Sequence, residues 1–194
     1  MKTKNLTGVG ILAAIVVVLQ LFSTVFSSFL PIARFTFCLV PIVIGGAIYG
    51  IKAGALLGGV FGAVVAGSML TGAGGAFGTL IVQKMPVQAI VITLARCILA
   101  GFVPAVIYKL ISKKDMVVGA FLAALLCPVI NTGLYCLGVI FVFADVFLEL
   151  NGGGNIYWLL LTGISVNFVV EFIINTLLSP VILTIIKVRT KQRG

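Results

Sequence analysis

Two charged side chains lie inside segments that are otherwise hydrophobic. Arg96 interrupts ITLARCILAGFV (residues 92–103), and Glu171 interrupts VNFVVEFIINTLL (residues 166–178). Arginine stays protonated in proteins, so its charge needs a partner or a wet cavity wherever apolar residues surround it. The two residues could form a buried ion pair that orients two helices, or either one could bind a charged ligand.

Other polar residues follow these charges at helical spacing. Asn167, Glu171 and Asn175 are separated by intervals of four, so a helix would project them from one side. Asn131 and Tyr135 repeat the interval on another segment. The pattern predicts one polar region in the interior of a helical protein.

Arg96 and Glu171 should also lie at similar depths. Arg96 follows Pro86 by about 15 Å of helix, and Glu171 follows Trp158 by about 20 Å, at a rise of ~1.5 Å per residue. We therefore expect both charges to point inward, either toward one another or toward a wet cavity.

The groups that most enzymes and metal sites use are missing from the sequence. It contains no histidine and neither CxxC nor HExxH nor a P-loop. The cysteines, Cys38, Cys97, Cys127 and Cys136, all fall in apolar segments, which predicts buried thiols. We expect no catalytic residue, no metal and no cofactor, and any ATP-driven step would need another protein.

The composition predicts a membrane protein. Hydrophobic residues make up 61% of the 194 residues, charged residues make up 9%, and the mean hydropathy is +1.32. These values favour an all-α integral membrane protein, which we expect to form a single domain over residues 1–194. The expected transmembrane helices are six, at about 8–29, 36–50, 53–70, 86–111, 116–144 and 156–187. The first segment is long enough to remain as a spanning helix and not a signal peptide.

Basic residues predict the orientation of these spans. Of the 13 lysines and arginines, ten fall on the side that carries both termini, whereas only Arg34 and Lys84 fall on the other side. The positive-inside rule then places both the N and the C terminus of this multi-pass membrane protein in the cytoplasm. The net charge of +9 reflects this topology and attraction to the lipid bilayer, so no nucleic acid is expected as a partner.

Small residues form a regular stripe. They recur every fourth position at Gly46, Gly50, Gly54, Gly58, Gly62 and Ala66. Such a stripe lets another helix approach closely, which favours packing inside the bundle over a partner-docking or sliding surface.

Two external segments each carry one cation. The glycine-rich segment 70–86 holds Lys84, and the link between the first two spans holds Arg34. We expect segment 70–86 to be an irregular loop or a re-entrant cover. The two cations could close as a lid over an anion, or they could meet lipid headgroups or the external acids Asp145 and Glu149.

The whole chain resembles a known family of membrane proteins. The segments that carry the resemblance are LVPIVIGGAIYGIKAGALLGGVFG (39–62), ARCILAGFVPAVIYKLISKK (95–114) and VNFVVEFIINTLLSPVI (166–182), after a basic N-terminus. Their order and spacing are similar to those of the substrate-binding S components of energy-coupling factor (ECF) vitamin transporters.

The resemblance implies a function and partners. Such components are not enzymes; they bind a vitamin from outside in a pocket at the external end of spans four to six, closed by external loops. They then associate with a membrane T component and two cytosolic ATPase subunits, and are thought to topple to release the ligand. Docking in the family uses a small-xxx-small motif on the first span, which Gly10 and Ala14 match here.

The expected ligand is a small-molecule vitamin or related micronutrient. Basic residues near the pocket favour an anionic ligand, and the scarcity of aromatic residues in spans four to six argues against a large flavin or pterin ring. Pantothenate is favoured, and lipoate, nicotinate, pyridoxine and riboflavin remain open. A six-span scaffold or assembly factor without transport is the main alternative, and an autonomous channel is a third. The candidate substrate-binding residues are Arg34, Lys84, Arg96, Asn131, Tyr135, Trp158, Asn167 and Glu171.

Overall fold

The computed structural model describes residues 3–29 and 38–191, except for the side chains of 3–4, 27–29, 162–167 and 189–191. The helices within these ranges are α1 (Thr3–Phe29), α2 (Leu39–Tyr49), α3 (Ile51–Leu70), α4 (Gly75–Lys84), α5 (Pro86–Ile111), α6 (Met116–Phe141), α7 (Ala144–Leu150) and α8 (Ile156–Lys191). No strand occurs in the described ranges, and the prediction of an all-α protein is confirmed.

Five helices, α1, α3, α5, α6 and α8, are long and apolar enough to cross a membrane. The remaining predicted span, the second (36–50), corresponds to α2, which is apolar but has only 11 residues. A helix of that length covers about 16 Å, roughly half of the hydrocarbon core of a bilayer. The chain is therefore a multi-span membrane protein in which one hydrophobic helix is short.

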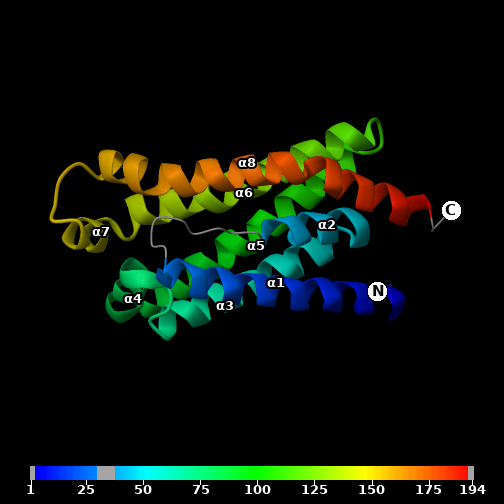
Figure 1. Cartoon of the computed structure of the whole chain (residues 1–194). Helices are drawn as coiled ribbons and strands as arrows, with labels where there is room; N and C mark the ends of the chain where they lie inside the picture. The colour runs from blue at the N-terminus through cyan, green and yellow to red at the C-terminus, as the bar shows by residue number, and fades with distance from the viewer. Residues whose placement is uncertain (1–2, 30–37, 192–194) are drawn as a thin grey trace.

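The two ends of the bundle differ in what they carry. α1 begins and α8 ends at the same end of the bundle, where the α2–α3 and α5–α6 turns also lie (Figure 1). Lys113 and Lys114 lie in the α5–α6 turn, and Lys52 is the second residue of α3, next to the α2–α3 turn. α4 and α7 lie at the opposite end (Figure 1). The basic turns thus gather at one end as expected, and the cytoplasmic assignment of that end stays a prediction, as does the single domain over 1–194.

Segment 70–86 is not an irregular loop, which was one of the two forms that we expected, and the other form, a re-entrant cover, stays a prediction. Most of it forms α4, and only residues 71–74 make a turn. The glycine count was misleading because Gly72 and Gly74 lie in that turn and Gly75 is the first residue of the helix. Within α4, Gly78 packs on the side chain of Met69, where a larger residue would have less room.

The end of the fifth predicted span also needs correction. α6 stops at Phe141, before the expected boundary at 144, and a separate helix, α7, follows. The sixth predicted span, 156–187, also ends later than expected, because α8 continues to Lys191. α7 was missed because a seven-residue helix has too few turns to produce a clear hydrophobic period.

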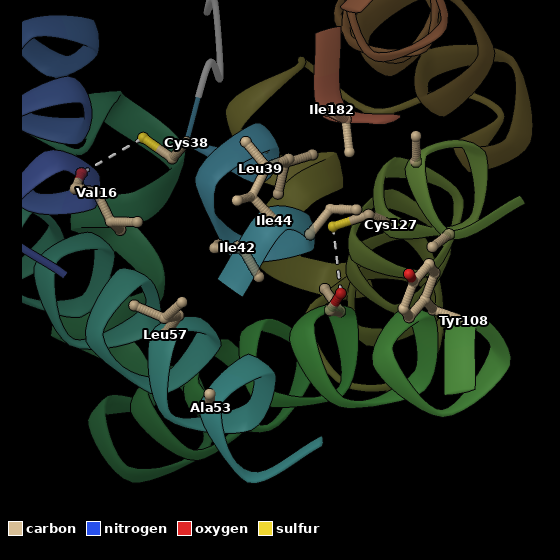
Figure 2. Packing of buried hydrophobic residues seen from close by; sticks show 14 of the residues in the cluster. Val16, Cys38, Leu39, Ile42, Ile44, Ala53, Leu57, Tyr108, Cys127 and Ile182 are labelled. Carbon is tan, nitrogen blue, oxygen red and sulfur yellow. Dashed lines mark hydrogen bonds between the residues drawn. The ribbon is translucent and has the colours of Figure 1, made fainter. Parts of the chain in front are cut away.

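The main apolar core surrounds α2, in the half of the bundle nearer the chain termini. We call this the inner half, and the half that carries α4 and α7 the outer half. Leu39 and Ile42 of α2 are fully buried, and Leu57 of α3 and Ile182 of α8 lie on different sides of them (Figure 2). α2 is therefore a buried central helix, which explains why its residues are hydrophobic on all sides.

The stripe of small residues packs α3 against α5. A Cβ at Gly54 or Gly58 would collide with the backbone carbonyl of Gly101 or Cys97, respectively. Gly50 takes a positive φ of 93° in the turn between α2 and α3, a conformation that favours glycine. Packing inside the bundle, the favoured interpretation of the stripe, is confirmed.

Proline residues inside the helices free carbonyl groups that the protein satisfies with side chains. Pro104 has no N–H to donate to the carbonyl of Ala100, and the Cys127 thiol of α6 donates to that oxygen at 3.2 Å (Figure 2). On α8, the Ser179 hydroxyl donates at 2.7 Å to the carbonyl four residues before Pro180. Cys127 thus links α5 to α6 in the buried interior.

The α3–α5 contact gives a prediction about stability. Gly58→Ala should lower the free energy of unfolding by about 1–3 kcal/mol, because the added methyl group meets backbone that cannot move aside. Gly67→Ala is the matched control, since nothing lies within 4 Å of a Cβ there. Unfolding of both variants in detergent would check this, and equal stability would show that α3 and α5 do not approach so closely.

Candidate functional site

The Arg96 guanidinium lies between two side chains of α6. Its Nη1 donates to Asn131 Oδ1 at 2.8 Å, and its Cζ lies 5.3 Å from the centre of the Tyr135 ring. Asn131 and Tyr135 are four residues apart, so one face of α6 presents both to α5. The hydrogen bond and the cation–π contact distribute the arginine charge over two neighbours.

One edge of the guanidinium remains open. The Nε atom of Arg96 is buried and has no hydrogen-bond partner among the described side chains. Nε and the adjacent Nη form the edge that binds a carboxylate through two parallel hydrogen bonds. A buried donor without an acceptor costs about 1–3 kcal/mol, so a ligand that supplied an acceptor here would recover that free energy.

Glu171 and Asn175 lie on the face of α8 that turns inward. Both are buried, and Asn175 Nδ2 donates to the backbone oxygen of Glu171 at 2.9 Å. Asn131 of α6 is also buried, and α6 packs against α8, so polar side chains of both helices lie in the interior of the bundle. The predicted polar region therefore exists.

Arg96 and Glu171 do not form an ion pair among the described contacts. Among the described contacts of Arg96, the hydrogen bond goes to Asn131, and Glu171 is not within ion-pair distance. Of the two alternatives that the sequence left open for this pair, the direct ion pair is not among the described contacts, and ligand contact stays a prediction. Asn131 was expected in the region, but not as the first partner of the arginine.

An aromatic cluster contacts Tyr135. Phe77 of α4 packs edge-on against Tyr135, with ring centroids 6.3 Å apart, and against Phe147 of α7, at 5.2 Å. The interplanar angles are close to perpendicular, the arrangement that the ring quadrupoles favour. Sequence analysis missed Phe77, because it lies in the segment that we expected to be irregular.

Lys84 forms an ion pair with Glu149. Lys84 is the last residue of α4 and Glu149 lies in α7, so the pair joins the two short helices. Both side chains are well exposed, at 42% and 62%. Contact with an external acid was the alternative to a lid cation that binds an anion, and the structure favours that alternative for Lys84.

The remaining candidates lie elsewhere. Trp158 is 65% exposed near the start of α8, a position that suits an interfacial aromatic belt and not the interior region. Asn167 lies on α8, but its side chain is outside the described residues, and Arg34 lies outside them altogether. Gly10 and Ala14 are exposed on α1.

Comparison with known proteins identifies one family. The chain matches the family model described as "ECF transporter, substrate-specific component" over residues 4–183. Comparison with curated proteins and with solved structures found no significant match.

The contacts of Arg96 give a prediction about coupling. A double-mutant cycle with Arg96→Met and Asn131→Ala should yield a coupling free energy of about 1.5–3 kcal/mol, as expected for a hydrogen bond to a charged group. The matched cycle with Glu171→Gln should give a smaller value. Unfolding measurements in detergent would compare the two cycles, and stronger coupling to Glu171 would restore the ion pair expected from the sequence.

Proposed function

Because the chain belongs to the family of substrate-specific components of ECF transporters, we propose that it binds a small, water-soluble carboxylic acid with high affinity. Membership of this family establishes a substrate-specific transport component of a multi-pass membrane protein, and the family is not one of enzymes. A vitamin or related micronutrient of the pantothenate type is the favoured ligand. The proposed location is the cell membrane of a prokaryote.

The observation that carries this proposal is the open edge of Arg96. The guanidinium is held by Asn131 and Tyr135, which leaves the buried Nε available for an acceptor. A carboxylate matches the fork of Nε and the adjacent Nη, and the low dielectric around the site strengthens such a bond. Arg96, Asn131 and Tyr135 are therefore the residues that we assign to substrate binding.

Other residues have weaker support. Glu171 is buried in the same region and could accept from a hydroxyl or amide group of the ligand. Asn167 and Arg34 stay in the proposal on the strength of the sequence alone. Lys84 and Trp158 lose support as direct contacts, since Lys84 pairs with Glu149 and Trp158 is mostly exposed.

The partners follow from the family in general terms. An ECF substrate-specific component associates with a T component and ATPases. For the docking surface we propose the face of α1 around Gly10 and Ala14. Both residues are exposed, and nothing lies within 4 Å of a Cβ built at Gly10. A helix of the T component could therefore approach α1 closely along this face.

The ligand can be tested directly. Protein purified in detergent should release a carboxylic acid that mass spectrometry identifies, and calorimetry should show that pantothenate binds more tightly than its primary-alcohol analogue. Arg96→Lys keeps the charge but loses the two-pronged edge, so it should weaken binding of the acid by about 10–100-fold.

Two results would contradict this proposal. Equal affinity of the acid for wild type and Arg96→Lys would remove Arg96 from the binding site. Absence of any bound or binding acid would favour the alternative, a membrane scaffold or assembly factor without transport.

The docking face gives a further prediction. Gly10→Leu and Ala14→Leu should prevent co-purification with the T component and the ATPases, because the larger side chains keep a partner helix at a distance. Gly133→Leu is the matched control, since Gly133 is also exposed, helical and without neighbours within 4 Å of a Cβ. Ligand affinity should be unchanged in all three, and normal assembly of the α1 variants would show that another face docks.

A further inference from the structure

We propose that Glu171 is a proton-binding site coupled to Arg96, so that the protein takes up one proton with each carboxylate that it binds. The proposal rests on the proposed function for the identity of the anion. The coupling between the two charges is a property of the protein itself, and it can be measured without a ligand.

Glu171 is the acid that lies in the interior of the bundle. The sequence contains four acidic residues, and the structure describes the side chains of all four. Glu171 is 6% exposed, whereas the other three are exposed and lie near helix ends, namely Asp115, Asp145 and Glu149. The buried carboxylate loses the hydration that exposed carboxylates keep, so its ionised form needs a compensating positive charge.

Arg96 supplies the matching positive charge. It is partly buried in the middle of α5, and its Nε atom is fully buried. The lysines whose side chains the structure describes are all exposed, namely Lys52, Lys84, Lys109, Lys113, Lys114 and Lys187. Among the described side chains, Arg96 is therefore the cation of the interior.

The two charges lie at comparable depths. Arg96 is ten residues from the outer end of α5, and its partner Asn131 is ten residues from the outer end of α6. Glu171 is 15 residues from the outer end of α8, which packs on α6. Both charges therefore belong to the middle of the bundle, away from the aqueous ends.

Charge balance couples the two residues. Without a ligand, the positive charge of Arg96 and the negative charge of Glu171 sum to zero. A carboxylate bound to Arg96 adds a second negative charge, and an uncompensated charge is far more costly in the interior than in water. A proton from water that bonds to a carboxylate oxygen of Glu171 restores neutrality, and no bond of the ligand breaks. Binding of a monoanionic acid is thereby linked to the uptake of one proton.

Asn175 offers an acceptor for this proton. It is fully buried one turn after Glu171 on the same face of α8, and its Nδ2 donates to the Glu171 backbone oxygen. Its Oδ1 is also buried and has no hydrogen-bond donor among the described residues. A protonated carboxyl has an O–H donor that a carboxylate lacks. Protonation of Glu171 thus supplies the type of group that Asn175 Oδ1 needs.

The other titratable groups near α8 do not compete for the proton. The sequence has no histidine. α8 packs on α2, α6 and α7. The described titratable side chains on or beside these four helices are Cys38, Cys127, Cys136, Tyr49, Tyr135, Tyr157, Lys187, Asp115, Asp145 and Glu149. Thiols, phenols and lysines are protonated near neutral pH, and exposed acids are ionised there. Glu171 is therefore the group whose charge changes when an anion binds.

Calorimetry of pantothenate binding in buffers of different ionisation enthalpy measures this uptake. The wild type should take up about one proton per acid, and its affinity should fall by up to about tenfold per pH unit between about pH 6 and 8. Glu171→Gln should bind without proton uptake, and more tightly than the wild type at about pH 8, because no proton is then required. Asn175→Leu removes the acceptor and should reduce the uptake. Asp145→Asn, which removes an exposed acid, is the matched control and should behave as the wild type.

Arg96→Met tests the coupling without a ligand, because it removes the positive charge as a bound anion would neutralise it. Folded Arg96→Met should bind a proton that its unfolded chain releases near neutral pH. Its unfolding equilibrium constant in detergent should therefore rise by up to about tenfold per pH unit between about pH 6 and 8. The wild type and the double variant Arg96→Met/Glu171→Gln should lack this slope. Arg96→Gln, which keeps a polar group beside Asn131, should show the same slope and guards against misfolding of the methionine variant.

The outcomes separate this proposal from the proposed function. Binding of the acid without proton uptake, or with uptake that persists in Glu171→Gln, would overturn the proton site and leave the proposed function in place. A pH slope in the arginine variants, together with no binding of pantothenate or another acid by the wild type, would support the coupling and contradict the proposed function. Absence of the slope in both arginine variants would overturn the proton site.

Discussion

The positive charge of Arg96 is the constraint around which the outer half of this protein is arranged. Hydrocarbon supplies no hydrogen-bond partner, and arginine does not deprotonate, so every stabilising contact must come from protein, water or ligand. Asn131 occupies one nitrogen and Tyr135 covers the guanidinium. The buried Nε is then the place where the protein has an unmet hydrogen-bonding capacity. In a substrate-specific transport component, we propose that this unmet capacity serves to bind the substrate.

The contacts around Arg96 depend on close packing deeper in the bundle. α5 approaches α3 closely because Gly54 and Gly58 have no side chains at the contact. In lipid, van der Waals contact and hydrogen bonds associate helices, and small residues increase both by bringing backbones together. The hydrogen bond from Cys127 to the carbonyl freed by Pro104 then links α5 to α6. α5 is thereby held on both sides, which fixes the depth of its arginine relative to Asn131.

The two ends of the molecule use different interactions, which suits their different tasks. The inner half is a continuous apolar core around the short helix α2, with fully buried residues such as Leu39 and Ile42. The outer end instead relies on small clusters joined by Phe77 and on an exposed ion pair. Elements with fewer buried contacts open at lower free energy than the core, so movement is expected at the outer end.

The sequence alone determined the class of the protein, the approximate spans, the side on which basic residues gather and the presence of a polar interior region. These features follow from local hydropathy and from helical spacing within one segment, so they need no knowledge of neighbouring helices. Only the tertiary structure decided that Arg96 bonds to Asn131, that Lys84 pairs with Glu149 and that α4 is a helix. Pairing between helices depends on their relative depth and rotation, and one helical turn of about 5.4 Å is enough to exchange one partner for another. The depths that we counted from Pro86 and Trp158 have an error of about that size. The packing of α3, α5 and α6 in the structure fixes the relative depths, and with them the partner of Arg96.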